Sequence, residues 1–325
     1  MSEDRPAVAV VLAAGQGVRM KSRSPKVLHE VCGLPMLAFV LDVVRDAGLT
    51  ETVVVIGYGA DEVRARFAEW DRPLRWVEQT DQKGTGHAVM VTETVLADFD
   101  GDVVVVCGDN PLLSAETVRE VLGRHRAEGA SCTVVTAEVP DPTGYGRIVR
   151  STDGGVEKIV EERDASQEEK RIREINSGNY VFDARRLFEA LKDIAPGNTQ
   201  QEYLLTDVVA VLRGSGRKVM SHVAADATEV LGINSRRQLA EAGRILQERI
   251  QSRLMDEGVT IADPQSTFIG PRVEVGRDTV ILPFTVIVGP SRIGSDCRIG
   301  PFAYVRAGST VTDGSEIGGF KETGA

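Results

Sequence analysis

The hydrophobic positions of the chain follow two patterns, one before and one after about residue 235. From Ala7 to about Gly232, short runs of Val and Ile alternate with segments whose apolar residues recur at helical spacing. The runs Val8–Leu12 and Val103–Val106 are apolar at every position, which is typical of strands buried on both faces. The alternation of such strands with helices predicts an α/β fold with a mostly parallel sheet.

The second pattern begins at Ser235. Ser235 to Glu257 mixes regularly spaced aliphatic residues with Arg, Glu and Gln, which predicts one long amphipathic helix closed by Gly258. A period of six residues follows, which cannot keep one helix face buried but can place one inward side chain on each side of a three-sided coil. The in-register aliphatic residues are Ile269, Val275, Ile281, Ile287, Ile293, Ile299, Val305, Val311 and Ile317.

This repeat resembles the hexapeptide family, which folds as a left-handed parallel β-helix. We therefore expect three parts in the chain. They are an α/β domain over residues 1–234, a linker helix over 235–262, and a short hexapeptide-repeat β-helix over 263–325.

Composition narrows the class of protein. The 38 Lys and Arg residues against 48 Asp and Glu residues give a net charge of −10, which disfavours a nucleic-acid partner. The apolar stretch Ala7–Ala14 is far shorter than the ~20 residues that span a bilayer, and the acidic start does not suit a signal peptide. We expect a cytoplasmic protein with no membrane partner. Its four cysteines lie far apart without a C-x-x-C pair, which argues against a disulfide framework or a zinc site.

A glycine-rich loop follows the first predicted strand. Ala13-Ala14-Gly15-Gln16-Gly17-Val18-Arg19-Met20 is followed by Pro25-Lys26, and glycines at a strand end let backbone N–H groups form an anion-binding concavity. Four basic residues and no acid lie between Arg19 and Lys26, so an anionic ligand is expected. Taken alone, the loop also fits a strand-to-helix turn with solvated basic residues. It matches neither a complete dinucleotide fingerprint nor a P-loop.

The loop resembles the L-A-A-G-x-G-x-R-M signature of sugar-1-phosphate nucleotidyltransferases, and six further motifs follow it in order. They are Gln79 with Gly84-Thr85-Gly86-His87-Ala88, Gly108-Asp109-Asn110-Pro111-Leu112, Asp141-Pro142-Thr143-Gly144-Tyr145-Gly146-Arg147-Ile148, Val160-Glu161, Glu174-Ile175-Asn176-Ser177-Gly178 and Gly232-Ile233-Asn234. With the hexapeptide repeat, they resemble the bacterial bifunctional N-acetylglucosamine-1-phosphate uridyltransferase/glucosamine-1-phosphate acetyltransferase family along the whole chain. The resemblance implies a Rossmann-like nucleotidyltransferase domain over residues 1–234.

The resemblance also implies a reaction. UTP and N-acetylglucosamine-1-phosphate would form UDP-N-acetylglucosamine and pyrophosphate for cell-wall peptidoglycan precursors, which makes the chain a UDP-N-acetylglucosamine diphosphorylase. Two polyanions must meet, and two like unit charges about 4 Å apart repel by ~4 kcal/mol at an effective dielectric constant of about 20. By resemblance, the catalytic cations are Arg19, toward the departing phosphates, and Lys26, toward the reacting phosphate.

Metal ligands are assigned in the same way. Asp109 and Asn234 match the family positions that hold Mg²⁺, and Asp109 follows the predicted strand Val103–Val106, at the strand end where ligands of α/β sheets bind. For Asp109 alone, a turn residue in Gly-Asp-Asn-Pro is an equally good explanation.

The remaining substrate contacts are also implied by the resemblance. Gln79 offers donors and acceptors to a uracil edge, while Gly146, Glu161 and Asn176 face the sugar. Glu161 lies in a charged patch, so a solvated strand end remains an alternative. The expected substrate-binding set is Leu12, Ala13, Ala14, Gly15, Lys26, Gln79, Gly84, Thr85, Gly108, Asp109, Gly146, Glu161, Asn176 and Asn234.

Some positions depart from the family pattern. Cys107 and Leu204 stand where the family often has Tyr, and Leu204 leaves strict N-acetyl selectivity open. The four histidines have no metal or triad spacing and are expected to be structural. The family's β-helix continues for several more coils with a catalytic histidine, whereas no histidine follows His222 here, so acetyltransfer is not expected. A homotrimer is expected by resemblance, through packing of the β-helix.

Two alternative functions stay open. An enzyme on the same fold could use glucose-1-phosphate, or dTTP in place of UTP. A non-catalytic regulatory subunit is a second alternative, against which the retained Arg19, Lys26, Asp109 and Asn234 argue.

Overall fold

The computed structural model describes residues 5–320 and 322–323, and its contacts divide the chain into two compact units. The first unit runs from the N-terminus to His29 and from Met36 to Asn234. The second combines Glu30–Pro35 with the chain from Ser235 onward. Within the described residues, no helix is long and apolar enough to cross a membrane.

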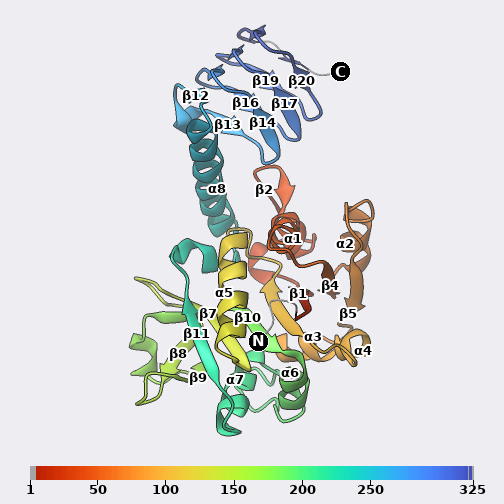
Figure 1. Ribbon diagram of the computed structural model, residues 1–325, viewed down its shortest axis with the longest axis vertical. Helices are drawn as coiled ribbons and strands as arrows, with labels where there is room; N and C mark the ends of the chain where they lie inside the picture. The colour runs from red at the N-terminus through yellow and green to blue at the C-terminus, as the bar shows by residue number, and fades with distance from the viewer. Residues whose placement is uncertain (1–4, 321, 324–325) are drawn as a thin grey trace. The chain divides into compact units, whose positions relative to one another are not determined.

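A nine-stranded sheet forms the centre of the first unit, with the order β11-β7-β10-β6-β1-β4-β5 (Figure 1). Off this path, β8 pairs with β10 and β9 pairs with β8. The strands β6, β1, β4 and β5 are parallel, and β11 is parallel to β7. Strand β10 is antiparallel to both β6 and β7. The mostly parallel sheet expected from the sequence is therefore confirmed. The strands are β1 (Ala7–Ala13), β4 (Glu51–Ile56), β5 (Arg75–Glu78), β6 (Asp102–Cys107), β7 (Cys132–Glu138), β8 (Arg147–Arg150), β9 (Val156–Val160), β10 (Glu174–Asp183) and β11 (Val219–Val223).

Seven helices and four short 3₁₀ turns are described in this unit. The helices are α1 (Met36–Asp46), α2 (Ala60–Arg66), α3 (Thr85–Met90), α4 (Glu93–Leu96), α5 (Ala115–Ala127), α6 (Ala184–Leu191) and α7 (Leu205–Gly214). The 3₁₀ turns are η1 (Val18–Met20), η2 (Lys26–Leu28), η3 (Glu169–Arg171) and η4 (Ala227–Val230).

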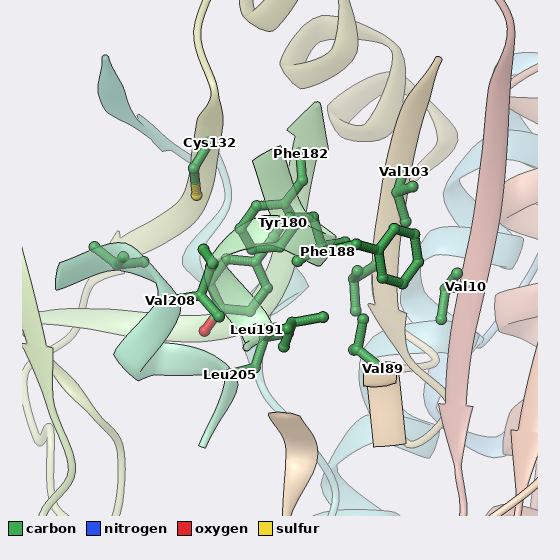
Figure 2. Packing of buried hydrophobic residues seen from close by; sticks show 14 of the residues in the cluster. Val10, Val89, Val103, Cys132, Tyr180, Phe182, Phe188, Leu191, Leu205 and Val208 are labelled. Carbon is green, nitrogen blue, oxygen red and sulfur yellow. The ribbon is translucent and has the colours of Figure 1, made fainter. Parts of the chain in front are cut away.

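The core of the sheet packs against α6 and α7. Figure 2 shows Tyr180 and Phe182 of β10 among side chains from both helices, and their rings stack with centroids 5.4 Å apart. Both aromatic residues are almost completely buried, and burial of such a side chain stabilises a fold by about 1.5–3 kcal/mol. The packing fixes α7, and the residues at the start of this helix reach the candidate site described below.

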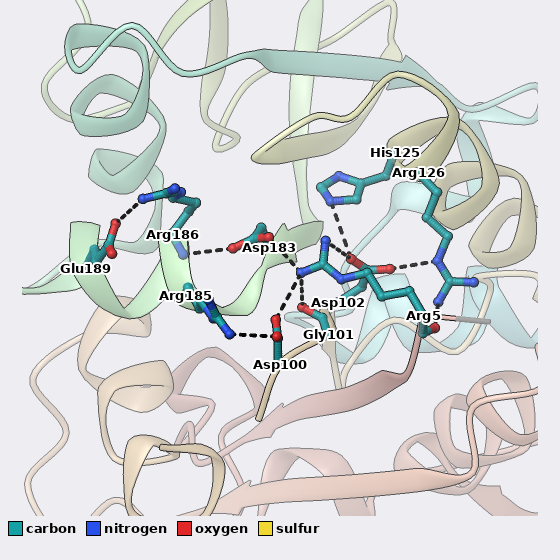
Figure 3. A network of polar contacts seen from close by, with 10 residues as sticks. All are labelled: Arg5, Asp100, Gly101, Asp102, His125, Arg126, Asp183, Arg185, Arg186 and Glu189. Carbon is teal, nitrogen blue, oxygen red and sulfur yellow. Dashed lines mark hydrogen bonds and ion pairs between the residues drawn. The ribbon is translucent and has the colours of Figure 1, made fainter. Parts of the chain in front are cut away.

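A polar network lies at the amino end of β6. Figure 3 shows Arg5 and Arg126 on either side of the fully buried Asp102. Arg126 donates from Nε to Asp102 Oδ2 at 2.7 Å, and Arg5 donates to Asp183 at 2.6 Å. Beside them, burial lowers the pKa of His125 to about 4, so its imidazole is neutral at pH 7. This network ties the segment before β1 to the start of β6, at the opposite end of that strand from Asp109.

The second unit contains three short parallel sheets. Strands pair with those one coil later, as in Ile281 with Ile299 and Ile287 with Val305, so the partners lie 18 residues apart, three periods of six. Eight of the nine aliphatic residues at this period are buried, and Val275 is half-buried, which confirms their inward orientation. The strands are β12 (Thr260–Ile261), β15 (Val280–Ile281), β18 (Arg298–Ile299) and β21 (Glu316–Ile317); β13 (Phe268–Ile269), β16 (Val286–Ile287), β19 (Tyr304–Val305) and β22 (Glu322–Thr323); and β14 (Val273–Val275), β17 (Ser291–Ile293) and β20 (Thr310–Val311).

The long helix α8 (Arg236–Asp256) belongs to this second unit. Its amino end is capped by Ser235, whose side chain accepts a hydrogen bond from Gln238 N. Gln247 and Gln251 donate to the carbonyls of Ile269 and Thr267 at 2.8 and 2.7 Å. The contacts group this helix with the repeat region and with the hairpin β2 (Glu30–Val31) and β3 (Leu34–Pro35). The boundary expected between a linker helix and the repeat stays a prediction.

Candidate active site

The carboxyl ends of β1 and β6 lie side by side, because Leu12 pairs with Cys107. Just beyond them, Gly108 N donates to Leu12 O at 2.9 Å, and a Cβ atom on Gly108 would lie only 3.0 Å from that oxygen. A side chain at this position would require the backbone to shift by a few tenths of an ångström, so the close approach favours glycine. The motifs that follow the two strands meet at one edge of the sheet, where ligands of open α/β sheets bind.

Lys26 lies between Asp109 and Asn234 at this edge. Its ammonium group donates to Asn234 Oδ1 at 2.7 Å and forms an ion pair with Asp109 Oδ2. The Lys26 side chain is only 12% exposed and that of Asp109 20%. A hydrogen bond of 3.0 Å from Ile233 N to Asp109 O holds the chain before Asn234 in place. Two oxygen atoms from distant parts of the sequence thus converge on one positively charged atom.

The glycine-rich loop packs over the stem of Lys26. Gly17 has a φ of +67°, and a Cβ atom there would lie 2.6 Å from Lys26 Cβ. Both the left-handed backbone and this contact require glycine. Arg19 follows on η1 and is exposed, as is Gly15, and Arg19 makes no hydrogen bond or ion pair within the described part of the chain. Its expected contact with phosphate stays a prediction.

The loops after β1, β4 and β5 form a second group. Ala14 O accepts hydrogen bonds from Tyr58 N and Gln82 Nε2, both at 3.1 Å. Gln79 is 4% exposed, and its side-chain amino group donates to Gly84 O at 3.0 Å. The residues expected to surround the base therefore lie together, with Ala13 and Ala14 buried.

The segment Gly84–Thr85 is joined to the chain before α7. Gly86 N donates to Tyr203 O at 2.8 Å, and Leu205 N donates to Thr85 Oγ1 at 3.1 Å. These bonds hold the buried Leu204 between the group around Gln79 and the start of α7.

The third group contains the residues expected to face the sugar. Asn176 N donates to Gly146 O at 2.9 Å, and a Cβ atom on Gly146 would lie 3.6 Å from Glu161 Oε1. Burial is the main cause that raises the pKa of Glu161, with Asp207, Asp164 and Glu202 adding to it. The hydroxyl of Thr206 donates to Glu161 at 3.4 Å and opposes this shift. Glu161 is therefore a partly desolvated carboxyl group rather than a solvated strand end.

Cys107 connects the third group to the end of β6. Its backbone N–H donates to Asn179 Oδ1 at 3.0 Å, and its thiol donates to Gly178 O at 3.4 Å. Gly178 N in turn donates to Asn176 Oδ1 at 3.1 Å. The thiol lies so close to Gly178 that a Cβ atom on this glycine would be only 2.8 Å from Cys107 Sγ. There is therefore little room for a larger side chain at either position.

Two neighbours of the expected residues were given no part in the site from the sequence, which predicted a structural role for His87. Thr206 bonds Glu161, and His87 Nδ1 lies 3.0 Å from Gln79 Nε2. The spacing Gly84-Thr85-Gly86-His87 places the histidine on the first turn of α3, which is the one signal in the sequence for its position. Within the described residues, no group of three or more His, Cys, Asp or Glu side chains is arranged to hold a metal ion.

Known proteins are similar to this chain over most of its length. The chain matches the family model described as a MobA-like NTP transferase domain over residues 9–210. It is 46% identical over 347 residues to the bifunctional protein GlmU of Heliobacterium modesticaldum, covering 97% of this chain and 75% of that protein. It is 49% identical over 298 residues to the GlmU protein of Geobacillus thermodenitrificans, covering 92% of this chain and 64% of that protein. The chain belongs to the GlmU family.

Membership of the GlmU family confirms the family expected from the sequence and its enzyme class, a nucleotidyltransferase of the UDP-N-acetylglucosamine diphosphorylase type. The crystal structure of UDP-glucose pyrophosphorylase complexed with UDP-glucose covers 75% of this chain and 99% of that one. It superposes with a TM-score of 0.62 at 18% identity, which shows a shared fold. This GlmU-family chain spans between about two thirds and three quarters of the length of the two relatives named above.

Proposed function

We propose that the edge formed by β1 and β6 catalyses attack by a phosphate oxygen of N-acetylglucosamine-1-phosphate on the α-phosphorus of UTP. A new bond from that oxygen to the α-phosphorus forms, and the bond from the α-phosphorus to the bridging oxygen breaks, which releases pyrophosphate. The observation that carries the proposal is the convergence of Lys26, Asp109 and Asn234 beside the glycine-rich loop.

The cations of the site have separate roles in this proposal. Lys26 is partly buried and held on two sides by Asp109 and Asn234, so its charge is fixed at this edge before substrate arrives and would face the reacting phosphate there. Arg19 is exposed on the neighbouring turn and has no ion pair within the described part of the chain, so its guanidinium group can follow the departing pyrophosphate.

The oxygen donors of the site suit Mg²⁺. Asp109 and Asn234 contribute a carboxylate and an amide oxygen that already meet at a positively charged atom, and such hard oxygen ligands are those that Mg²⁺ prefers. We propose that these two residues hold the ion, which would neutralise phosphate charge when bound.

Selection of the substrates follows from the other two groups. Gln79 and the backbone of Gly84 and Thr85 would contact the uracil. Glu161 would accept hydrogen bonds from ring hydroxyls, and Asn176 would contact the acetamido group, with Gly146 allowing close approach. Leu204 would supply an apolar wall for the acetyl methyl group.

The test is pyrophosphate release across a panel of UTP, dTTP and CTP with N-acetylglucosamine-1-phosphate or glucose-1-phosphate. We expect the highest kcat/KM with UTP and N-acetylglucosamine-1-phosphate, loss of turnover with a chelator, and recovery on addition of Mg²⁺. A preference for glucose-1-phosphate would overturn the proposed substrate, and turnover that is insensitive to chelation would overturn the metal assignment.

We further propose that the three parallel sheets form a left-handed hexapeptide β-helix and that the chain associates as a homotrimer through it. Phe284, Phe302 and Phe320 form an exposed stacked column in this unit, with ring centroids 5.0 and 5.2 Å apart. Exposed apolar surface of this kind is often covered by association. Light scattering at micromolar concentration should give the mass of three chains, and the mass of one chain would contradict the proposal.

A further inference from the structure

The side-chain amide of Gln79 is held in one orientation by two neighbours. The carbonyl of Gly84 can only accept a hydrogen bond, so the atom of Gln79 that faces it at 3.0 Å must be the amino nitrogen Nε2. The same Nε2 lies 3.0 Å from His87 Nδ1. Both hydrogens of the amino group are thereby used, and Gln79 Oε1 has no hydrogen bond within the described part of the chain.

This arrangement specifies the state of His87. Nδ1 can accept from Gln79 only if it is unprotonated, so the imidazole is neutral with its proton on Nε2. An imidazolium, or the other neutral tautomer, would set an N–H group against the amino group of Gln79.

The ring of His87 is itself held in place. It contacts the ring of Tyr203 with centroids 6.5 Å apart. Tyr203 is fixed by backbone bonds of 2.8 Å, from its N–H to Lys83 O and from Gly86 N to its carbonyl. The two rings line a pocket of about 500 Å³ on this side of α3, together with the charged side chains of Lys83, Glu93 and Lys192.

We propose that His87 is a positioning residue for base selection, which fixes the amide of Gln79 so that Oε1 is presented to the bound base. This inference rests on the proposed UTP site. A carbonyl oxygen accepts a hydrogen bond from the N3–H group of uracil, whereas N3 of cytosine carries a lone pair and would be repelled. Thymine presents the same N3–H group as uracil, so the contact selects against CTP but does not separate UTP from dTTP.

The test compares kcat/KM for UTP, dTTP and CTP in the full chain and three variants. His87→Ala removes the acceptor, and His87→Asn places an amide oxygen near the position of Nδ1. Lys83→Ala is the matched control, because this exposed side chain lines the same pocket and bonds Asp81 rather than Gln79.

We expect His87→Ala to lower the UTP:CTP ratio by about five- to tenfold, the effect of one net hydrogen bond, and to leave the UTP:dTTP ratio unchanged. His87→Asn should restore most of the UTP:CTP ratio, and Lys83→Ala should change neither ratio. An unchanged UTP:CTP ratio in His87→Ala, with an unfolding midpoint like that of the wild type, would overturn the proposal. Equal decreases of kcat/KM for UTP and CTP would show that His87 has only a structural role, and would also overturn the proposal.

A second measurement does not depend on turnover. Long-range proton–nitrogen NMR spectra of ¹⁵N-histidine-labelled protein report which imidazole nitrogen carries the proton. We expect His87 to be protonated on Nε2 alone at neutral pH, and a proton on Nδ1 would overturn the inference even if His87→Ala does not fold. If the wild type forms no UDP-sugar with any nucleotide, the proposed function fails, whereas the NMR spectrum still decides the orientation of Gln79.

Discussion

Replacing Lys26 by Met tests the centre of the proposed site. The variant keeps most of the aliphatic stem that packs under Gly17, and it removes the ammonium group that meets Asp109 and Asn234. A unit charge about 4 Å from a phosphate oxygen contributes ~4 kcal/mol at an effective dielectric constant of about 20. Loss of a single oriented donor to a developing charge costs about 2.7–4 kcal/mol in well-studied enzymes. At 1.36 kcal/mol per tenfold change in rate, we expect kcat to fall by about 10²- to 10³-fold.

The same substitution changes stability by a smaller amount. Asp109 loses its cation while it remains 20% exposed, a case between an exposed ion pair and a fully buried one. We expect the free energy of unfolding to fall by about 1–3 kcal/mol. This loss is too small to unfold the chain at 25 °C, because typical stabilities are about 5–15 kcal/mol.

Single-turnover pyrophosphate release and denaturant unfolding measure the two effects separately. Lys21→Met is the matched control, since Lys21 is an exposed residue that follows the same glycine-rich loop, and it should keep wild-type turnover. A Lys26→Met variant that is folded and turns over within tenfold of the wild type would refute the role of the ammonium group in charge neutralisation.

Three further predictions follow from the same contacts. Asp109→Ala should remove about 3 kcal/mol of transition-state stabilisation, which lowers kcat. It should also abolish the Mg²⁺-dependent binding of UTP measured by calorimetry, and binding like that of the wild type would reject the metal assignment. Glu161→Gln should raise the unfolding midpoint at neutral pH, because a folded-state pKa above 4.5 makes the carboxylate destabilising once the pH exceeds that value. This rise in the unfolding midpoint should vanish below pH 4.5. An equal rise at neutral pH and below pH 4.5 would contradict the prediction. As the pH falls from 6.5 toward about 4, His125 should lower the free energy of unfolding. The reason is that its imidazole binds a proton at a higher pH in the unfolded chain than in the folded chain. In His125→Gln, the free energy of unfolding measured by circular dichroism should depend less on pH over that range than in the wild type.

The sequence by itself determined the elements that have a local signature. The parallel pairing of strands 18 residues apart, with aliphatic residues turned inward, follows from the period of six. Strands β1 and β6 follow from runs that are apolar on both faces. The glycines at the ends of these strands also have local causes, a sharp turn and a close backbone approach. Motif by motif, these signals were enough to indicate a nucleotidyltransferase of the GlmU family.

Only the tertiary structure decided how distant motifs meet. The bond between Lys26 and Asn234 joins residues 208 positions apart, and no local pattern contains that distance. Strand β10 lies antiparallel between β6 and β7, although its own residues are compatible with either direction. Its pairing with β8 brings Asn176 beside Gly146. The state of His87 was likewise out of reach, since the orientation of an amide and the tautomer of an imidazole depend on which acceptors folding places around them.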